Sequence, residues 1–241
     1  MTSLTETSHP RPAGTTTRCL MVVRQDHETR RFEVLGDLTA HESGGFTFRY
    51  RPDVAAQPDF RPIPGFADPT VVYEADELFP FFQNRVMSPR REDYGQLLHA
   101  VGLASDEDAP VELLIRTAGR RATDTFQIVP HPTVVEAGRE QRLFLVSGIR
   151  HIGGASDAVA RLRTGQRLTL RPEPSNPHDS RAVLLDTDSG SPIGWVPGYL
   201  CDYVHEHQAA GGDVEVTVVQ ANGPDVPRHL QLLCRMTVTP G

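Results

Sequence analysis

The sequence predicts an α+β protein built from two domains. Apolar and polar residues alternate over short segments in both halves of the chain, as they do in half-buried strands. Helical patterns accompany them in the first half, whereas strand patterns dominate the second. The stretch 130-PHPTVVEAGRE-140, which contains proline and glycine, separates the halves. The 241 residues leave room for two domains of about 100 residues each, and we expect them at 17–132 and 140–241.

The first half is expected to form a small α+β domain behind a disordered tail at residues 1–16. Strands are predicted at 18–25, 31–40, 45–51 and 125–130. Helices are predicted at 76–87, 90–103 and 111–119. A proline-rich loop is expected between the third strand and the first helix.

The second half is expected to form a small closed β-barrel with two short helices. Strands are predicted at 142–149, 167–173, 181–187, 193–197, 214–223 and 230–238. The helices are predicted at 155–165 and 198–211. Short strands in this number favour a closed barrel, because closure leaves no unpaired sheet edge.

The charge distribution places any anion site early in the second half. The net charge of −7 argues against a protein that coats nucleic acid through a broad basic surface. Residues 142–181, however, hold seven arginines against three acidic residues, whereas 182–241 hold two arginines against seven. We therefore expect phosphate contacts from the first of these segments.

Several functional classes are not supported by the sequence. No apolar run approaches the roughly 20 residues that span a bilayer, and the N-terminus has no signal-peptide pattern. Three widely spaced cysteines favour free, buried thiols in a reducing cytoplasm. No phosphate loop, kinase motif or converging set of carboxylates is visible, so we expect no catalytic residue, no cofactor and no metal site.

The stretch 171-RPEPSNPHDSRAV-183 carries more polar side chains than a simple turn needs. Together with 143-LFLVSGIRHIGG-154 and 192-PIGWVP-197, it resembles the HIRAN domain family over most of 140–241. The resemblance implies an OB-like barrel. This family is best known as a module of chromatin-remodelling and fork-reversal helicases, where it captures the 3′ end of single-stranded DNA, and it also occurs in stand-alone bacterial proteins.

The resemblance implies binding to single-stranded DNA or a DNA 3′ end, in repair, replication or defence. A 3′-terminal nucleotide presents a base face, a phosphate and a free hydroxyl, so its pocket needs planar side chains, a cation and an acceptor. The expected DNA-binding residues are Arg150, His151, Arg171, Asn176, His178, Asp179 and Trp195. His151 and His178 replace tyrosines of the helicase members and titrate near neutral pH.

Plainer interpretations of the same residues remain open. Asn176 and Asp179 are also typical of a turn in which side chains accept hydrogen bonds from backbone amides. Trp195, the single tryptophan, also fits a core position.

The first half is similar to the N-terminal subdomain of HipA-type toxin kinases, in the runs GFTFRYRPD, LFPFFQNRVMSPRRED and LLIRTAGRRATDTFQIVP. The match departs from the family at 86–89 and at 123–126, and the kinase body is absent. This resemblance implies an alternative function, in which the protein is an antitoxin or regulatory partner of a separate HipA-type kinase.

Overall fold

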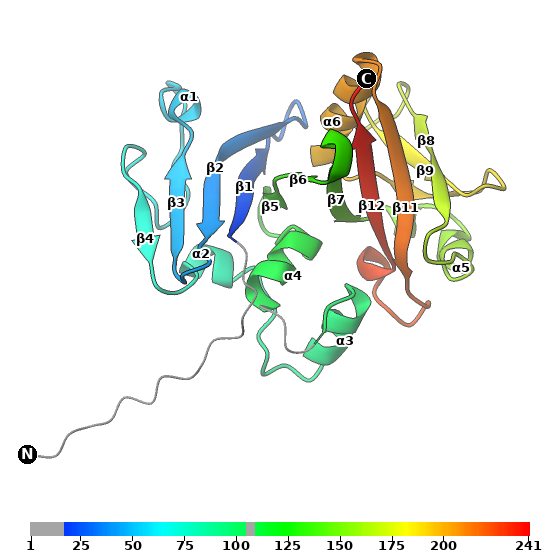
Figure 1. The fold of residues 1–241 in the computed structure, drawn as a ribbon, viewed down its shortest axis with the longest axis horizontal. Coiled ribbons are helices and arrows are strands. Elements are labelled where there is room, and N and C mark those ends of the chain that lie inside the picture. The colour runs from blue at the N-terminus through cyan, green and yellow to red at the C-terminus, as the bar shows by residue number, and fades with distance from the viewer. Residues whose placement is uncertain (1–16, 105–108) are drawn as a thin grey trace, which may run out of the picture.

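A computed structural model describes residues 17–104 and 109–241, and the predicted N-terminal tail lies outside them. The described residues form a five-stranded sheet and a seven-stranded sheet, both antiparallel, which lie side by side in the molecule (Figure 1). The predicted α+β class is confirmed.

The first sheet has the strand order β4-β3-β2-β1-β5. Its strands are β1 (Arg18–Gln25), β2 (Phe32–Ala40), β3 (Phe46–Tyr50), β4 (Tyr73–Ala75) and β5 (Phe126–Pro130). All except β4 were predicted from the sequence. One face of this sheet packs on a cluster of rings in which Phe48 lies 4.5 Å from Phe66 and 5.8 Å from Phe82, measured between ring centroids.

The outward face of β1 corrects one prediction. Leu20 and Val22 point into the core, so the alternation of the strand turns Cys19 to the surface. Cys19 is exposed, whereas Cys201 and Cys234 are buried as expected.

Two of the three helices predicted in the first half are much shorter than expected, as is the helix predicted at 155–165 in the second half. The helices of the first half are α1 (Pro52–Ala55), α2 (Pro80–Gln83), α3 (Tyr94–Ala100) and α4 (Ala109–Thr117). The residue before Pro80 is held in an extended conformation, with ψ of 143°, so helix α2 cannot begin earlier. Gly102 adopts a left-handed φ of 67° just after α3 and ends it.

The second sheet has the order β10-β9-β8-β11-β12-β7-β6 and forms the predicted barrel. Its strands are β6 (Thr133–Val134), β7 (Glu140–Leu145), β8 (Arg167–Pro172), β9 (Val183–Asp186), β10 (Pro192–Trp195), β11 (Asp213–Ala221) and β12 (Leu232–Thr239). The barrel closes where Ser147, just after β7, exchanges two backbone hydrogen bonds with Trp195 at 2.9 and 2.8 Å. The remaining helical elements are η1 (Glu136–Gly138), η2 (Ile149–His151), α5 (Ala155–Val159), α6 (Gly198–Ala209) and η3 (Arg228–Leu230).

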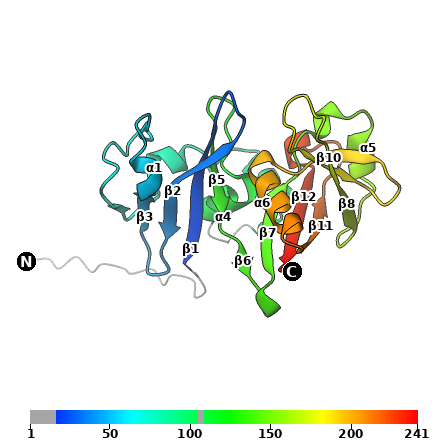
Figure 2. The ribbon, with the colours of Figure 1, turned by 90° about the horizontal axis from the view of Figure 1, so that it is seen from above.

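The two sheets are joined through α3 and α6. The amide of Asn222, beyond β11, donates a 2.8 Å hydrogen bond to the carbonyl of Ala100 at the end of α3. On another side, the ring of Tyr199 on α6 meets Phe32 of β2 edge to face at 6.2 Å, and Figure 2 shows α6 between the sheets. None of the helices in the described part of the chain has the length and apolar character needed to cross a membrane.

Candidate nucleic-acid interface

The turn between β8 and β9 is held by its own polar side chains. The Asn176 Oδ1 atom accepts hydrogen bonds from the backbone amides of His178 and Asp179, at 3.0 and 3.2 Å. The Asp179 Oδ1 atom accepts one from the amide of Arg181 at 2.9 Å. The Oδ1 atoms of Asn176 and Asp179 thus hold the turn, as the plainer interpretation of these residues expected. The Oδ2 atom of Asp179 takes no part in these hydrogen bonds.

Glu173 connects this turn to the tryptophan. Its Oε2 atom accepts hydrogen bonds from the indole Nε1 of Trp195, at 2.7 Å, and from the amide Nδ2 of Asn176, at 3.0 Å. Glu173 was not among the expected site residues. Glu173 directly follows β8, and nothing in that position of the sequence indicates contact with a residue 22 positions later.

Trp195 lies between the turn and the segment that carries Arg150. It is half-buried, so the core interpretation does not hold for the whole ring. Its six-membered ring packs on Gly148, where an added Cβ would stand 2.4 Å from a ring carbon. Gly148 also has a left-handed φ of 75°. Both the close contact with the ring and this backbone conformation therefore require glycine.

Arg150 and His151 are exposed on the 3₁₀ turn η2, directly after Gly148. The Arg150 Nε atom donates a 3.0 Å hydrogen bond to Nε2 of His151, which must therefore be unprotonated at that nitrogen. Within residues 17–104 and 109–241, no carboxylate forms an ion pair with Arg150, and its positive charge is available to a phosphate.

Two other arginines that looked available in the sequence are already paired. Arg171 makes a bidentate contact with Asp186 across neighbouring strands, at 2.6 and 3.1 Å. Arg181 forms an ion pair with Asp202 of α6. Because a local carboxylate compensates each charge, these guanidinium groups are weaker phosphate contacts than Arg150.

A second arginine, Arg228, contacts Arg150 from near the C-terminal end of the sequence. The Arg228 Nη1 atom on η3 donates to the carbonyl of Arg150 at 3.4 Å. Beside it, burial lowers the pKa of His229, and the positive charges of Arg120 and Arg150 lower it further. These four residues, Arg120, Arg150, Arg228 and His229, are called the basic cluster below.

The basic cluster extends beyond residues 142–181, the segment in which the sequence placed the expected anion site. Arg228 belongs to the acidic last quarter of the sequence and Arg120 to the first half. Sequence spacing gave no sign of either, because contacts between η2 and η3 join segments 78 residues apart.

The expected site residues therefore form one surface with two ends. Asn176 and Asp179 lie with Glu173 at the acidic end, and Arg150 and His151 lie at the basic end. Trp195 lies between the two ends. His178 is exposed on the turn, and among the described residues its ring makes no hydrogen bond. Arg171 borders the acidic end, 3.8 Å from Glu173.

Residues 144–239 match the family model of the HIRAN domain. A crystal structure of a protein from Lactobacillus plantarum is similar to this chain at 19% identity, over 42% of this chain and 96% of that one, with a TM-score of 0.33. The crystal structure of the HIRAN domain of human HLTF is similar at 14% identity, over 42% and 72% of the two chains, with a TM-score of 0.29. No curated protein matches this sequence.

Proposed function

We propose that the barrel at residues 144–239, which is a HIRAN domain, binds the end of a single DNA strand that carries a free 3′-hydroxyl. A HIRAN domain implies nucleic-acid binding, and the geometry of the exposed surface supports the finer proposal.

The observation that carries the proposal is the position of Trp195 between two groups of opposite charge. Its indole edge is fixed by Glu173 and its ring rests on Gly148, next to Arg150. A base stacked on a tryptophan held in this way would place its sugar and phosphate within reach of both ends of the surface. Stacking contributes about 1–3 kcal/mol per base without selecting a sequence.

The two ends suit the two polar groups of a terminal nucleotide. Arg150 and Arg228 suit the phosphate, because neither is compensated by a carboxylate of the described chain. Glu173 and Asp179 repel phosphate but accept a hydrogen bond from a hydroxyl. A strand is therefore expected to end at the turn, with its 3′-hydroxyl beside the carboxylates and its last phosphate beside the arginines.

The test compares two oligonucleotides of one sequence, one ending in a 3′-hydroxyl and the other in a 3′-phosphate. Trp195 is the only tryptophan, so quenching of its fluorescence reports a base stacked at this position, and anisotropy of a 5′-labelled strand gives the affinity. We expect quenching and tighter binding for the hydroxyl end. Equal affinities would overturn end recognition, and binding without quenching would overturn the stacking position.

A further inference from the structure

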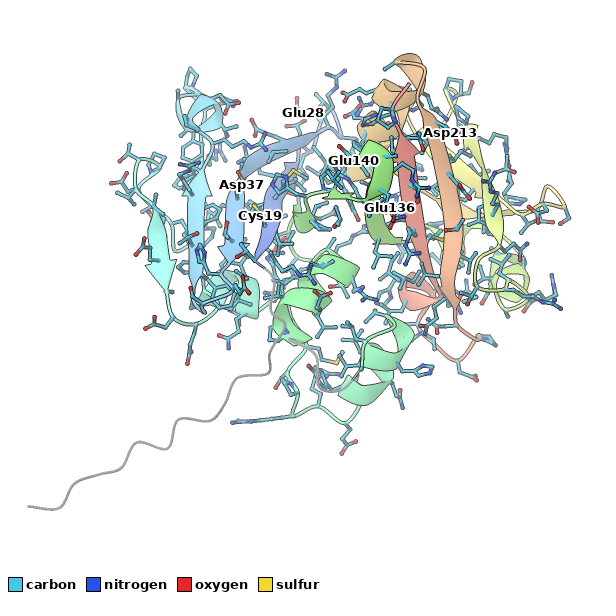
Figure 3. All side chains as sticks on the ribbon, in the orientation of Figure 1. Cys19, Glu28, Asp37, Glu136, Glu140 and Asp213 are labelled. Atoms are coloured by element: carbon cyan, nitrogen blue, oxygen red, sulfur yellow. The ribbon has the colours of Figure 1, made fainter. Side chains whose placement is uncertain are left out.

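Three side chains of metal-binding type meet on the face of the first sheet opposite its ring core. Cys19 lies on β1, Asp37 on β2 and His131 just after β5, and Figure 3 shows Cys19 and Asp37 side by side. One thiol, one carboxylate oxygen and one ring nitrogen from these residues all lie within 4.8 Å of one another.

The strand register explains why these residues gather. Cys19 pairs with Thr39, and Met21 pairs with both Asp37 and Val129. Side chains two positions apart on a strand share a face, so Cys19, Asp37 and the residue two after Val129 all point outward together. The backbone amide of His131 donates to the carbonyl of Cys19 at 3.2 Å, which continues the pairing of β5 as far as this point.

Cys19 and Asp37 each have an outer neighbour that orients them, and His131 is held by its contact with Asp37. The Thr39 hydroxyl donates to Sγ of Cys19 at 3.8 Å. Asp37 Oδ1 lies 2.9 Å from Nε2 of His131, while Asp37 Oδ2 lies 3.9 Å from Nε of Arg51. Outer contacts of this kind fix ligand orientation at metal sites.

We propose that Cys19, Asp37 and His131 form a binding site for a zinc-class divalent cation, with an open fourth position. Thiolate, carboxylate and imidazole are all ligands of zinc, and three protein ligands leave one coordination position for water or another molecule. Thiolate and carboxylate together carry a charge of −2 beside a neutral imidazole, which matches a divalent ion. The positive charge of Arg51 would then compensate the negative charge on Oδ2 of Asp37, the oxygen that does not bind the ion.

The distances are compatible with this site after a small adjustment. Ligand atoms about 2.0–2.3 Å from a tetrahedral zinc lie about 3.3–3.8 Å from one another. The three atoms lie at most 4.8 Å apart, and the closest pair, Asp37 Oδ1 and His131 Nε2, is 2.9 Å apart. Tetrahedral separations therefore require movements of about 1 Å. The side chains of Asp37 and His131 are 33% and 38% exposed and can rotate.

A catalytic thiol is the competing interpretation, because a cysteine, a histidine and an aspartate also occur together in thiol enzymes. Burial raises the pKa of the Cys19 thiol, the bond from Thr39 lowers it and Asp37 raises it, with a net upward shift. A nucleophilic cysteine requires the opposite shift. A divalent cation binds the thiolate directly and displaces the proton, so its binding releases protons.

The test is a titration of the full, untagged chain with Co²⁺, followed by displacement with Zn²⁺. Cys201 and Cys234 are buried, so a near-ultraviolet thiolate-to-cobalt band reports Cys19. We expect one equivalent of Co²⁺ to produce this band, with visible bands of a four-coordinate ion, and Zn²⁺ to abolish both. Cys19→Ser should lose the near-ultraviolet band, and Thr39→Val should bind about 10-fold more weakly.

The matched control is His41→Ala. His41 also contacts a threonine hydroxyl on this sheet, Thr47 at 3.1 Å, and lies outside the proposed ligand set. His131→Ala should weaken binding strongly, whereas His41→Ala should not. Absence of a thiolate-to-cobalt band in the wild type, or equal affinities of wild type, Cys19→Ser and His131→Ala, would overturn the proposal. Melting curves of each variant without metal show whether it is folded.

Discussion

The first sheet with its helices, called the first domain below, and the barrel fill their cores with different kinds of side chain. The first sheet packs on rings, with Phe48, Phe66 and Phe82 in mutual contact and almost no solvent exposure. The barrel core is aliphatic, and Phe144 is its one phenylalanine. Aromatic rings in the first domain therefore serve packing, whereas Trp195 of the barrel presents part of its ring at the surface, where a ligand can use it.

The arginines of the two parts also differ in whether they are buried and paired or exposed at the surface. In the first domain the side chain of Arg85 is 2% exposed, makes a bidentate contact with Asp124 and lies 4.3 Å above the ring of Phe81. In the barrel, Arg150 and Arg228 are exposed and contact no carboxylate of the described residues. A guanidinium group that is already paired and buried stabilises the fold, while an exposed one without a carboxylate partner is suited to bind an external anion.

The largest expected effect is a difference in stability between variants of Phe82, a core ring, and Trp195, the proposed stacking ring. Phe82→Ala should destabilise the first domain by about 3–5 kcal/mol, because it empties a fully buried site. Trp195→Ala should cost less than half of this, since the ring is half-buried. Urea unfolding of both variants, followed by far-ultraviolet circular dichroism, measures the difference. Equal losses would mean that Trp195 is a core residue.

The next effect concerns DNA affinity. Trp195→Ala should weaken binding of a 3′-hydroxyl strand by about 1–3 kcal/mol, the contribution of one stacked base. Trp195→Phe keeps a stacking face but loses the bond to Glu173, so it should retain most of the affinity. Anisotropy titrations measure both, and Phe82→Ala, where it is still folded, is the control. A larger loss for Phe82→Ala than for Trp195→Ala would contradict the assignment.

The salt dependence of binding distinguishes free from paired arginines. Arg150→Ala and Arg228→Ala should each lower the slope of log affinity against log salt by about one unit, the value for one phosphate contact. Arg171→Ala should leave the slope nearly unchanged, because Asp186 already compensates that charge. Titrations at several salt concentrations measure the slopes. An equal decrease for Arg171→Ala would show that this ion pair opens when DNA binds.

The sequence predicted the barrel well because its strands alternate clearly. Val214, Val216 and Val218 are buried in turn along β11, as a period of two requires. Two helices of the first domain, α2 and α3, were predicted too long, because Pro80 and Gly102 decide their ends through backbone conformation rather than through apolar spacing.

Partners across strands and turns could not be predicted in the same way. Arg171 meets Asp186 because Thr169 pairs with Asp186, and that register is not visible in either strand alone. Arg228 reaches Arg150 only after the barrel has folded. Identifying Arg150 and Trp195 from the sequence required the family pattern, whereas identifying the basic cluster required the structure.

The smallest predicted effect is a dependence of DNA binding on pH through the basic cluster. In the free protein, burial and the charges of Arg120 and Arg150 lower the pKa of His229 below its usual value of about 6.5. A phosphate bound at Arg150 offsets this repulsion and raises that pKa again, so binding takes up protons. Affinity should therefore increase as pH falls from about 8 to 6, a range in which the arginines stay charged.

His229→Gln tests the sign of this effect and its source. Because the unfolded chain binds the His229 proton more tightly than the folded one, the free energy of unfolding should decrease as pH falls below about 6.5 towards the lowered pKa. DNA binding has the opposite trend, since the phosphate favours the charged imidazole. The variant should flatten both trends, measured by urea unfolding and by anisotropy. If it flattens the stability trend alone, His229 lies beside the arginines but no phosphate binds there, and the basic cluster is not part of the DNA site.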